Sequence, residues 1–242
     1  MLKRTLRRSA GLLWWWVWRG VFLFVVVSVS LVMLFRVVPP PGSMVMVERK
    51  IQSWVNSEPI QLQREWRSWS QLSDSAKVAV MAAEDQRFPH HHGFDIAELR
   101  RALQASREGG RLRGASTISQ QTAKNVFLWT GRSWVRKGLE AWFTVLIELI
   151  WGKQRILEVY LNVAEWDTGV FGLEAAAQHY FGVSASGLTE RQASLLAAIL
   201  PSPLTRSAAL PDPQVEQRSQ WVRQQMRNLG GPEYLQHVAP DP

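Results

Sequence analysis

Two adjacent carboxylates, Glu84 and Asp85, close an apolar run in the stretch AAEDQRFPHHHGFD (residues 82–95). We expect them in the last turn of a helix, where exposed carbonyl groups create a negative potential. That potential and burial both raise the pKa of a carboxyl group, and a raised pKa suits general acid–base catalysis. Two solvated acids at a helix end also fit, and from spacing alone they are the commoner arrangement.

Three consecutive histidines, His90, His91 and His92, follow in the same stretch. Neighbouring residues of a regular element cannot all point at one metal ion, and zinc-binding helices use i, i+4 spacing instead. The sequence therefore predicts no metal site here. We expect one histidine to pack inward and bond a neighbour, with the other two in solvent.

Polar donors recur at helical spacing in GASTISQQTAKNVFL, which we predict to be a helix over residues 116–128. Thr117, Gln121 and Lys124 stand at i, i+4 and i+7 and share one face of that helix. Hydroxyl, amide and ammonium donors beside a helix N-terminus can cradle a diphosphate. An ordinary polar face with a solvated lysine fits the spacing equally well.

A second polar stripe crosses the apolar segment SWVRKGLEAWFTVLIELI. Arg136 and Glu140 are one helical turn apart and can pair, and Thr144 and Glu148 continue the stripe. Two glutamates argue against a membrane span. Buried glutamates need partners, so they either face a cleft or form structural salt bridges, and the structural role is the commoner one.

An N-terminal anchor precedes these segments. MLKRTLRR is basic, and GLLWWWVWRGVFLFVVVSVSLVMLF is almost wholly apolar. About 20 apolar residues span a bilayer, so we predict a cytoplasmic tail over 1–10 and a transmembrane helix over 11–38 that the following prolines end. The basic cluster places the remainder of the chain outside the cytoplasm. A cleaved signal peptide is less favoured, because the apolar run exceeds the roughly 7–15 residues of a signal h-region.

Composition narrows the class of partner. The 242 residues carry a net charge of +8, no cysteine and thirteen tryptophans. The charge favours an anionic partner, and the absence of cysteine excludes disulfides, thiol catalysis and Cys-ligated zinc. Between residues 129 and 155 tryptophans alternate with arginines and lysines, a pattern of nucleic-acid binding or of contact with anionic lipid headgroups. The predicted N-terminal membrane anchor favours contact with lipid headgroups over nucleic-acid binding.

Residues 73–242 are predicted to form one mostly α-helical domain. Residues 39–72 are predicted to be a membrane-proximal linker with a short strand or an interfacial stretch, and residues 107–116 a mobile basic loop. Helix ends are predicted at Ser73 or Asp74, Phe88, Gly109-Gly110, Ser133, Gly182, Thr189 with Gln192, Pro201, Asp212-Pro213 and Gly230-Gly231.

Five blocks, in this order, resemble glycosyltransferase family 51, the peptidoglycan glycosyltransferases, and most closely its monofunctional biosynthetic members. The blocks are EDQRFPHHHG, GASTISQQTAKN, RKGLE, RILEVYLN and AAAQHYFG, within about residues 78–203. One departure is Ala115, where the family usually has a second glycine. We expect this alanine to stiffen the loop and to perturb phosphate approach slightly.

The resemblance implies roles for individual residues. It implies that Glu84 is the catalytic base, which takes the proton from the 4-hydroxyl of the acceptor sugar. Glu140 corresponds to a second catalytic glutamate that positions neighbouring groups or a metal. The implied substrate-binding residues are Asp85, Phe88, His91, Thr117, Gln121, Lys124, Asn125 and Arg136. Of these, the ones implied to hold a diphosphate are Thr117, Gln121, Lys124 and Arg136.

The implied fold is a lysozyme-like, mostly α glycosyltransferase domain behind a single N-terminal transmembrane helix. The implied reaction polymerises lipid II into β-1,4-linked glycan, with inversion and release of undecaprenyl diphosphate, on the periplasmic side of the inner membrane. No cofactor is obligatory, although a divalent cation, Mg²⁺ or Mn²⁺, can assist. Expected partners are lipid II, undecaprenyl-diphosphate-linked glycan and membrane lipid, with cell-wall synthesis or division proteins as candidates and no nucleic acid.

Alternative functions follow from the same residues. The sequence has no S-x-x-K and no K-T-G motif, so we expect polymerisation without transpeptidation. A lysozyme-like glycan hydrolase would also use two carboxylates. The cationic face argues against it, because a hydrolase has no diphosphate to stabilise. A non-catalytic membrane-anchored scaffold would not need Glu84.

Overall fold

The computed structural model describes residues 2–107 and 116–238, and the chain forms two compact units, residues 1–38 and residues 39–242. In the first unit, helix α1 (Leu2–Val37) contains a stretch, Trp14–Val37, that is long and apolar enough to cross a membrane. The helix ends before the prolines at 39–41, as predicted, because proline cannot continue a helix.

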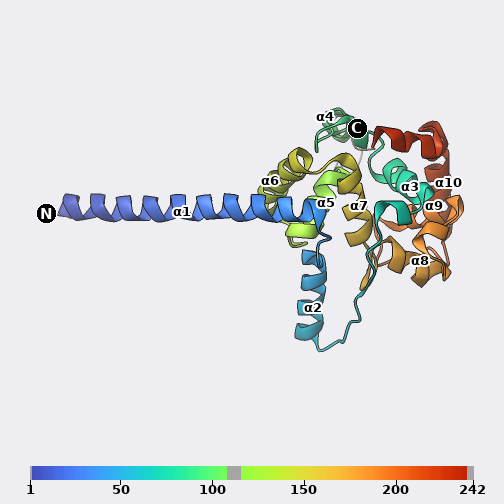
Figure 1. The fold of residues 1–242 in the computed structure, drawn as a ribbon, viewed down its shortest axis with the longest axis horizontal. Helices are drawn as coiled ribbons and strands as arrows, with labels where there is room; N and C mark the ends of the chain where they lie inside the picture. Colours follow the sequence, from blue (N-terminus) through green and yellow to red (C-terminus); the bar gives the residue numbers. More distant parts are fainter. Residues whose placement is uncertain (1, 108–115, 239–242) are drawn as a thin grey trace. The chain divides into compact units, whose positions relative to one another are not determined.

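The second unit is mostly helical, which confirms the predicted fold class. Helices α3, α9 and α10 pack together on one side of this unit, and α5 packs between α6 and α7 on the other (Figure 1). The helices are α2 (Met44–Asn56), α3 (Asp74–Glu84), α4 (Ile96–Arg107), α5 (Ile118–Phe127), α6 (Trp134–Ile150), α7 (Lys153–Val163), α8 (Leu173–Phe181), α9 (Glu190–Ile199) and α10 (Pro213–Asn228). Short 3₁₀ helices are η1 (Trp69–Gln71), η2 (Phe88–His90), η3 (Ala185–Gly187) and η4 (Gly231–His237).

Residues 39–72 belong to the second unit and are more ordered than the predicted linker. Helix α2 covers much of this segment and begins at Ser43, whose side chain accepts a hydrogen bond from the backbone N–H of Met46. Strand β1 (Gln63–Arg64) then pairs in parallel with β3 (Val170–Phe171), which also pairs antiparallel with β2 (Glu165–Asp167). The predicted short strand is therefore present, but a helix that the sequence analysis did not predict precedes it.

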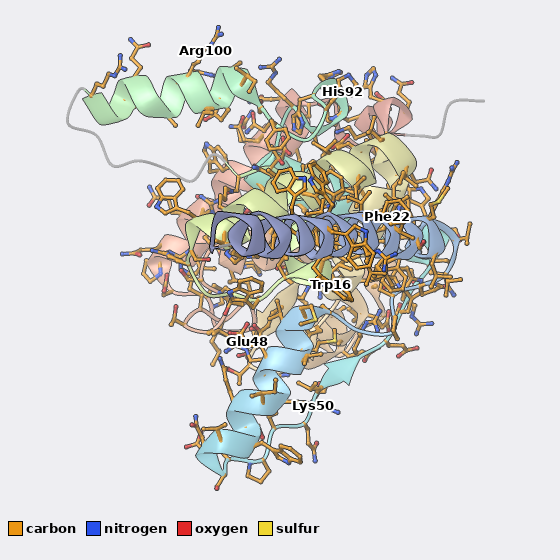
Figure 2. The ribbon with its side chains drawn as sticks, turned by 90° about the vertical axis from the view of Figure 1, so that its left-hand side faces the viewer. Trp16, Phe22, Glu48, Lys50, His92 and Arg100 are labelled. Atoms are coloured by element: carbon orange, nitrogen blue, oxygen red, sulfur yellow. The ribbon has the colours of Figure 1, made fainter. Side chains whose placement is uncertain are left out.

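Helix α2 and helix α4 lie at opposite ends of the second unit (Figures 1 and 2). Glu48 and Lys50 project from α2, and Arg100 projects from α4 (Figure 2). Helix α2 is held to the body of the unit by ion pairing, since both oxygens of Glu165 accept from Arg49 at 2.8 Å. The two ends of the unit therefore present separate surfaces, with the core helices between them.

Several predicted helix ends are confirmed by their caps. Ser133 and Asp212 cap α6 and α10, Thr189 forms a capping box with Gln192 before α9, and Gly182 ends α8 in a left-handed conformation. The predicted end at Gly109-Gly110, the loop around it and Ala115 lie outside the described residues.

Two predicted helix ends are wrong. Helix α3 stops at Glu84 rather than Phe88, because Asp85 leaves the helical conformation with φ −161° and ψ 78°. Helix α5 begins after Thr117 rather than after Ser116, since Thr117 is the N-cap and forms a capping box with Gln120. Both differences place active-site side chains at helix ends, where tertiary partners fix them.

Gly93 has a backbone conformation that other residues rarely adopt, with φ +83°. A Cβ atom at this position would lie 2.7 Å from Cγ2 of Thr144. We predict that Gly93→Ala lowers the free energy of unfolding by about 1–3 kcal/mol, because strain and overlap add. Denaturant unfolding followed by tryptophan fluorescence measures this.

Gly138→Ala is the matched control, because no atom lies within 4 Å of an added Cβ on that exposed position of α6. Alanine there is expected to stabilise the helix by up to about 1 kcal/mol. An equal loss of stability in both variants would contradict the assignment of a special role to Gly93.

Candidate active site

The carboxylate of Glu84 is held from two other helices. Glu84 is the last residue of α3, and its Oε2 accepts a hydrogen bond from Nε2 of Gln121 on α5 at 2.9 Å. Its Oε1 lies 4.0 Å from Nη2 of Arg218 on α10. Burial raises the pKa of Glu84, and the contacts with Gln121 and Arg218 oppose that rise without cancelling it. The raised pKa expected from the sequence is therefore present, with burial as its main cause.

Tyr160 fixes the orientation of the Gln121 amide. The hydroxyl of Tyr160 on α7 donates a hydrogen bond to Oε1 of Gln121 at 3.2 Å, so Nε2 of the amide faces Glu84. Burial raises the pKa of Tyr160 well above its ordinary value, and the phenol therefore keeps its proton. Three helices thus contribute to one hydrogen-bonded chain that ends on the carboxylate of Glu84.

Asp85 connects the end of α3 to the start of α5. Its carboxylate accepts hydrogen bonds from Nε2 of His91 at 3.0 Å and from the backbone N–H of Ile118 at 3.0 Å. These contacts explain why Asp85 leaves the helix. His91 is buried whereas His90 and His92 are exposed, which confirms that one histidine packs inward. Asp85 and His91 therefore hold the backbone on which Glu84 sits.

A group of cations surrounds Glu140. Its carboxylate, buried on α6, pairs with Nη1 of Arg136 at 2.6 Å and with the ammonium of Lys137. Lys124, on the facing helix α5, is influenced by the same charges. Burial lowers the pKa of Lys124, the charge of Glu140 raises it, and the charges of Arg136 and Lys137 lower it. Glu140 thus balances part of a positive charge that three basic side chains create.

The other predicted substrate-binding residues on α5 and at its N-cap have different surroundings. The hydroxyl of Thr117 donates to the carbonyl oxygen of Gly93 at 2.7 Å and accepts from the N–H of Gln120 at 3.2 Å. Gln121 is bonded to Glu84 and Tyr160, as described above. Asn125 is half-buried on α5. Lys124 and Arg136 are therefore the predicted residues that carry positive charge at this site.

A cleft of about 620 Å³ opens beside Glu84. It lies between the end of α3, the start of α4, the start of α5 and helix α10. Its lining includes Glu84, Asp85, Gln86, Arg87, Asp95, Glu98, Arg101, Ser116, Thr117, Gln121, Pro201, Arg218 and Trp221. Glu84 therefore lines a space large enough for sugar rings.

Sequence reasoning missed three contributors to this site. Tyr160 lies in the RILEVYLN block, whose apolar neighbours concealed a polar role. Arg218 lies on α10, a helix rich in polar residues, with no motif to mark it. Lys153 pairs with Glu148 at 2.8 Å and lies 4.5 Å above the ring of Phe88.

The stripe on α6 is structural for the most part. Glu148 accepts from Lys153 and from the hydroxyl of Ser119, and Thr144 donates to the carbonyl oxygen of Glu140 at 2.7 Å. The ion pair of Glu148 with Lys153 is the kind of partner that a buried glutamate requires.

Phe88 is fully buried beneath Lys153, so it shapes the turn after Glu84.

The residues around the site do not suit a protein-held metal. Among the described residues, no three His, Asp or Glu side chains come together as a set of ligands. Both oxygens of Glu140 already bind cationic side chains. The carboxylate of Glu140 is therefore occupied by cationic side chains and not open to a metal ion.

A half-buried carboxylate, Glu84, lines a cleft, and a cluster of cations lies on the neighbouring helices α5 and α6. This arrangement suits an enzyme that transfers a group from a substrate with an anionic leaving group. The family profile described as "Transglycosylase" matches residues 50–227. The chain belongs to this transglycosylase family.

Two relatives named "Biosynthetic peptidoglycan transglycosylase" are similar over nearly their whole length. The protein from Chromohalobacter salexigens is 66% identical over 215 residues, which cover 89% of this chain and 92% of the relative. The protein from Pseudomonas aeruginosa is 61% identical over 235 residues, which cover 97% and 98%.

Proposed function

We propose that this protein is a peptidoglycan glycosyltransferase that polymerises lipid II into β-1,4-linked glycan and releases undecaprenyl diphosphate. Membership of the transglycosylase family and the names of its relatives support the reaction class. The observation that carries the proposal is the placement of one buried carboxylate, Glu84, at a sugar-sized cleft within reach of the charge of Lys124. Transfer from a diphosphate-linked sugar uses a base for the acceptor hydroxyl and a cation for the diphosphate. Hydrolysis of glycan releases no diphosphate that a cation would stabilise.

The base performs the first half of the reaction. Glu84 accepts the proton of the acceptor 4-hydroxyl as that oxygen forms a bond to the anomeric carbon of the donor sugar. The bond from the anomeric carbon to the diphosphate oxygen breaks on the opposite face, so the configuration inverts. Gln121 and Arg218 fix the carboxylate, which accepts the incoming proton on an oxygen lone pair.

The cations stabilise the leaving group. The diphosphate oxygen gains negative charge as its bond to the sugar breaks, and a preorganised ammonium or guanidinium stabilises that charge without reorganising in the transition state. Lys124 and Arg136 serve this role, and Glu140 pairs with Arg136 and offsets part of the repulsion between the cations. Thr117 contributes by fixing the start of α5.

Exposed apolar side chains support contact of the domain with a membrane. Trp54 on α2 is 90% exposed, and Trp134 and Leu149 on α6 are 92% and 78% exposed. Large exposed apolar side chains on a domain that follows an apolar helix in the sequence favour insertion at the lipid interface. We propose an inner-membrane protein with a cytoplasmic N-terminus and a periplasmic catalytic domain.

Catalysis is proposed to need no obligatory cofactor, with Mg²⁺ or Mn²⁺ acting only through the substrate diphosphate. No S-x-x-K or K-T-G motif is present in the sequence, so no transpeptidation is proposed. Proteins of cell-wall synthesis or division remain proposed partners.

Incubation of the purified full-length protein in detergent with labelled lipid II, and separately with preformed glycan, tests this function. The proposal predicts polymer from lipid II and no loss of preformed glycan. Degradation of glycan without polymer would establish the hydrolase instead. No change in either substrate would support the scaffold.

A further inference from the structure

A guanidinium on the C-terminal helix reaches the base from outside the five sequence blocks. Arg218 Nη2 lies 4.0 Å from Glu84 Oε1 and donates a hydrogen bond to the carbonyl oxygen of Ala83 at 3.3 Å. The same guanidinium lies 5.6 Å from the centre of the Trp221 ring. Arg218 and Trp221 also line the cleft with Glu84. The guanidinium is thus oriented by groups on two helices before any substrate binds.

We propose that Arg218 is a positioning residue that holds Glu84 ionised and aimed into the cleft, through the carboxylate oxygen that Gln121 does not bind. The inference rests on the proposed transferase function. A carboxylate bonded through one oxygen alone can rotate about its terminal torsion, which is broad. An ion pair on the second oxygen restricts that rotation and favours the charged form.

The surroundings of Glu84 make such a partner necessary. Burial is the largest influence on its pKa and raises it. The hydrogen bond from Gln121 lowers the pKa, followed by the charge of Arg218, and Asp85 raises it. Lys124 lowers it further, and Tyr160 faces the same group as a neutral phenol. Arg218 is the strongest charged influence that keeps the base ionised.

Arg218→Gln tests the proposal through the pH dependence of kcat/KM with lipid II. Loss of the positive charge raises the pKa of Glu84, so the base is protonated over a wider acidic range. An opposite charge within 4–6 Å lowers a carboxyl pKa by about 1–3 units. We therefore expect the acid limb, the fall of kcat/KM at low pH, to move up by about one pH unit. Below that limb kcat/KM should be about tenfold lower than in wild type, and above it the two proteins should have the same kcat/KM.

Arg218→Lys and Arg223→Gln complete the design. Lysine keeps the charge on a different head group, so we expect an acid limb between those of wild type and Arg218→Gln. Arg223 lies on the same helix, 3.9 Å from Glu216, and does not line the cleft. Its substitution removes one charge from α10 and is expected to leave the acid limb in place.

The outcomes separate this inference from the proposed function. An equal loss at every pH in Arg218→Gln, or an unchanged acid limb, would overturn the positioning role while wild-type activity stands. If Arg218→Gln does not fold, the uncharged Arg218→Met takes its place, and an acid limb that matches wild type in that variant overturns the positioning role. A wild-type protein that does not polymerise lipid II would overturn the proposed function itself.

Discussion

Glu84→Gln is expected to lower kcat for lipid II polymerisation by about 10²–10⁴-fold, which is the usual contribution of a positioned general base. Glutamine keeps the shape of the side chain and an oxygen that can accept the hydrogen bond from Gln121, but it cannot take the proton of the acceptor hydroxyl. Binding of lipid II and the stability of the domain should therefore change little. Single-turnover assays with labelled lipid II measure the chemical step, and thermal unfolding measures stability.

Glu190→Gln is the matched control for this prediction. Glu190 begins α9, is half exposed, and its carboxylate lies 3.7 Å from Nη1 of Arg227. It does not line the cleft, so polymerisation should proceed at the wild-type rate. If Glu84→Gln kept more than a tenth of wild-type kcat, Glu84 would not be the base.

The wild-type protein should also lose activity as the pH falls through the pKa of Glu84. Because that pKa is raised by burial, the loss begins at a higher pH than for an exposed glutamate. Activity is present above the pKa, where the carboxylate is charged, and is lost below it.

Lys124→Gln is expected to lower kcat by about 10²–10³-fold, comparable with removal of one preorganised donor from a developing oxyanion. The ammonium faces charge that appears on the diphosphate only as the sugar bond breaks, so the effect falls mainly on kcat rather than on KM. A steady-state analysis with lipid II separates the two constants.

The pH profile gives a second measure of Lys124. Burial lowers the pKa of this ammonium, so its charge and its contribution are lost as the pH rises through that lowered pKa. Wild type should show an alkaline limb that Lys124→Gln lacks. The exposed Lys50 on α2 is the matched control (Figure 2), and Lys50→Gln should keep both rate and limb. An alkaline limb that persists in Lys124→Gln would contradict the assignment.

Local signals in the sequence predicted the helices and their caps well. Ser133, Thr189 and Asp212 act through bonds to residues within one turn, so sequence spacing alone locates them. The helix ends at Glu84 and Thr117 depend instead on contacts between distant segments. Asp85 bonds Ile118, 33 positions away, and Thr117 bonds Gly93, 24 positions away. Helix α2 was missed because its pattern is interrupted by charged residues that pair with distant partners.

The site shows the same division. The placement of Glu84 at a helix end and the pair of Arg136 with Glu140 follow from spacing along a single helix. The contact of Glu84 with Gln121 and the approach of Arg218 join helices that are far apart in the chain. Spacing placed Gln121 on the same face as Lys124, but could not show that its amide is already committed to the base.

The ratio of diphosphate released to glycosidic bonds formed tests the central claim most directly. Lipid II labelled in both its sugar and its undecaprenyl chain allows both products to be counted in one reaction with the full-length protein. The proposed transferase predicts one undecaprenyl diphosphate for each new β-1,4 bond throughout the time course. Release of lipid diphosphate without matching polymer, or of free sugar from finished glycan, would show that water rather than the acceptor hydroxyl attacks, and would contradict the account.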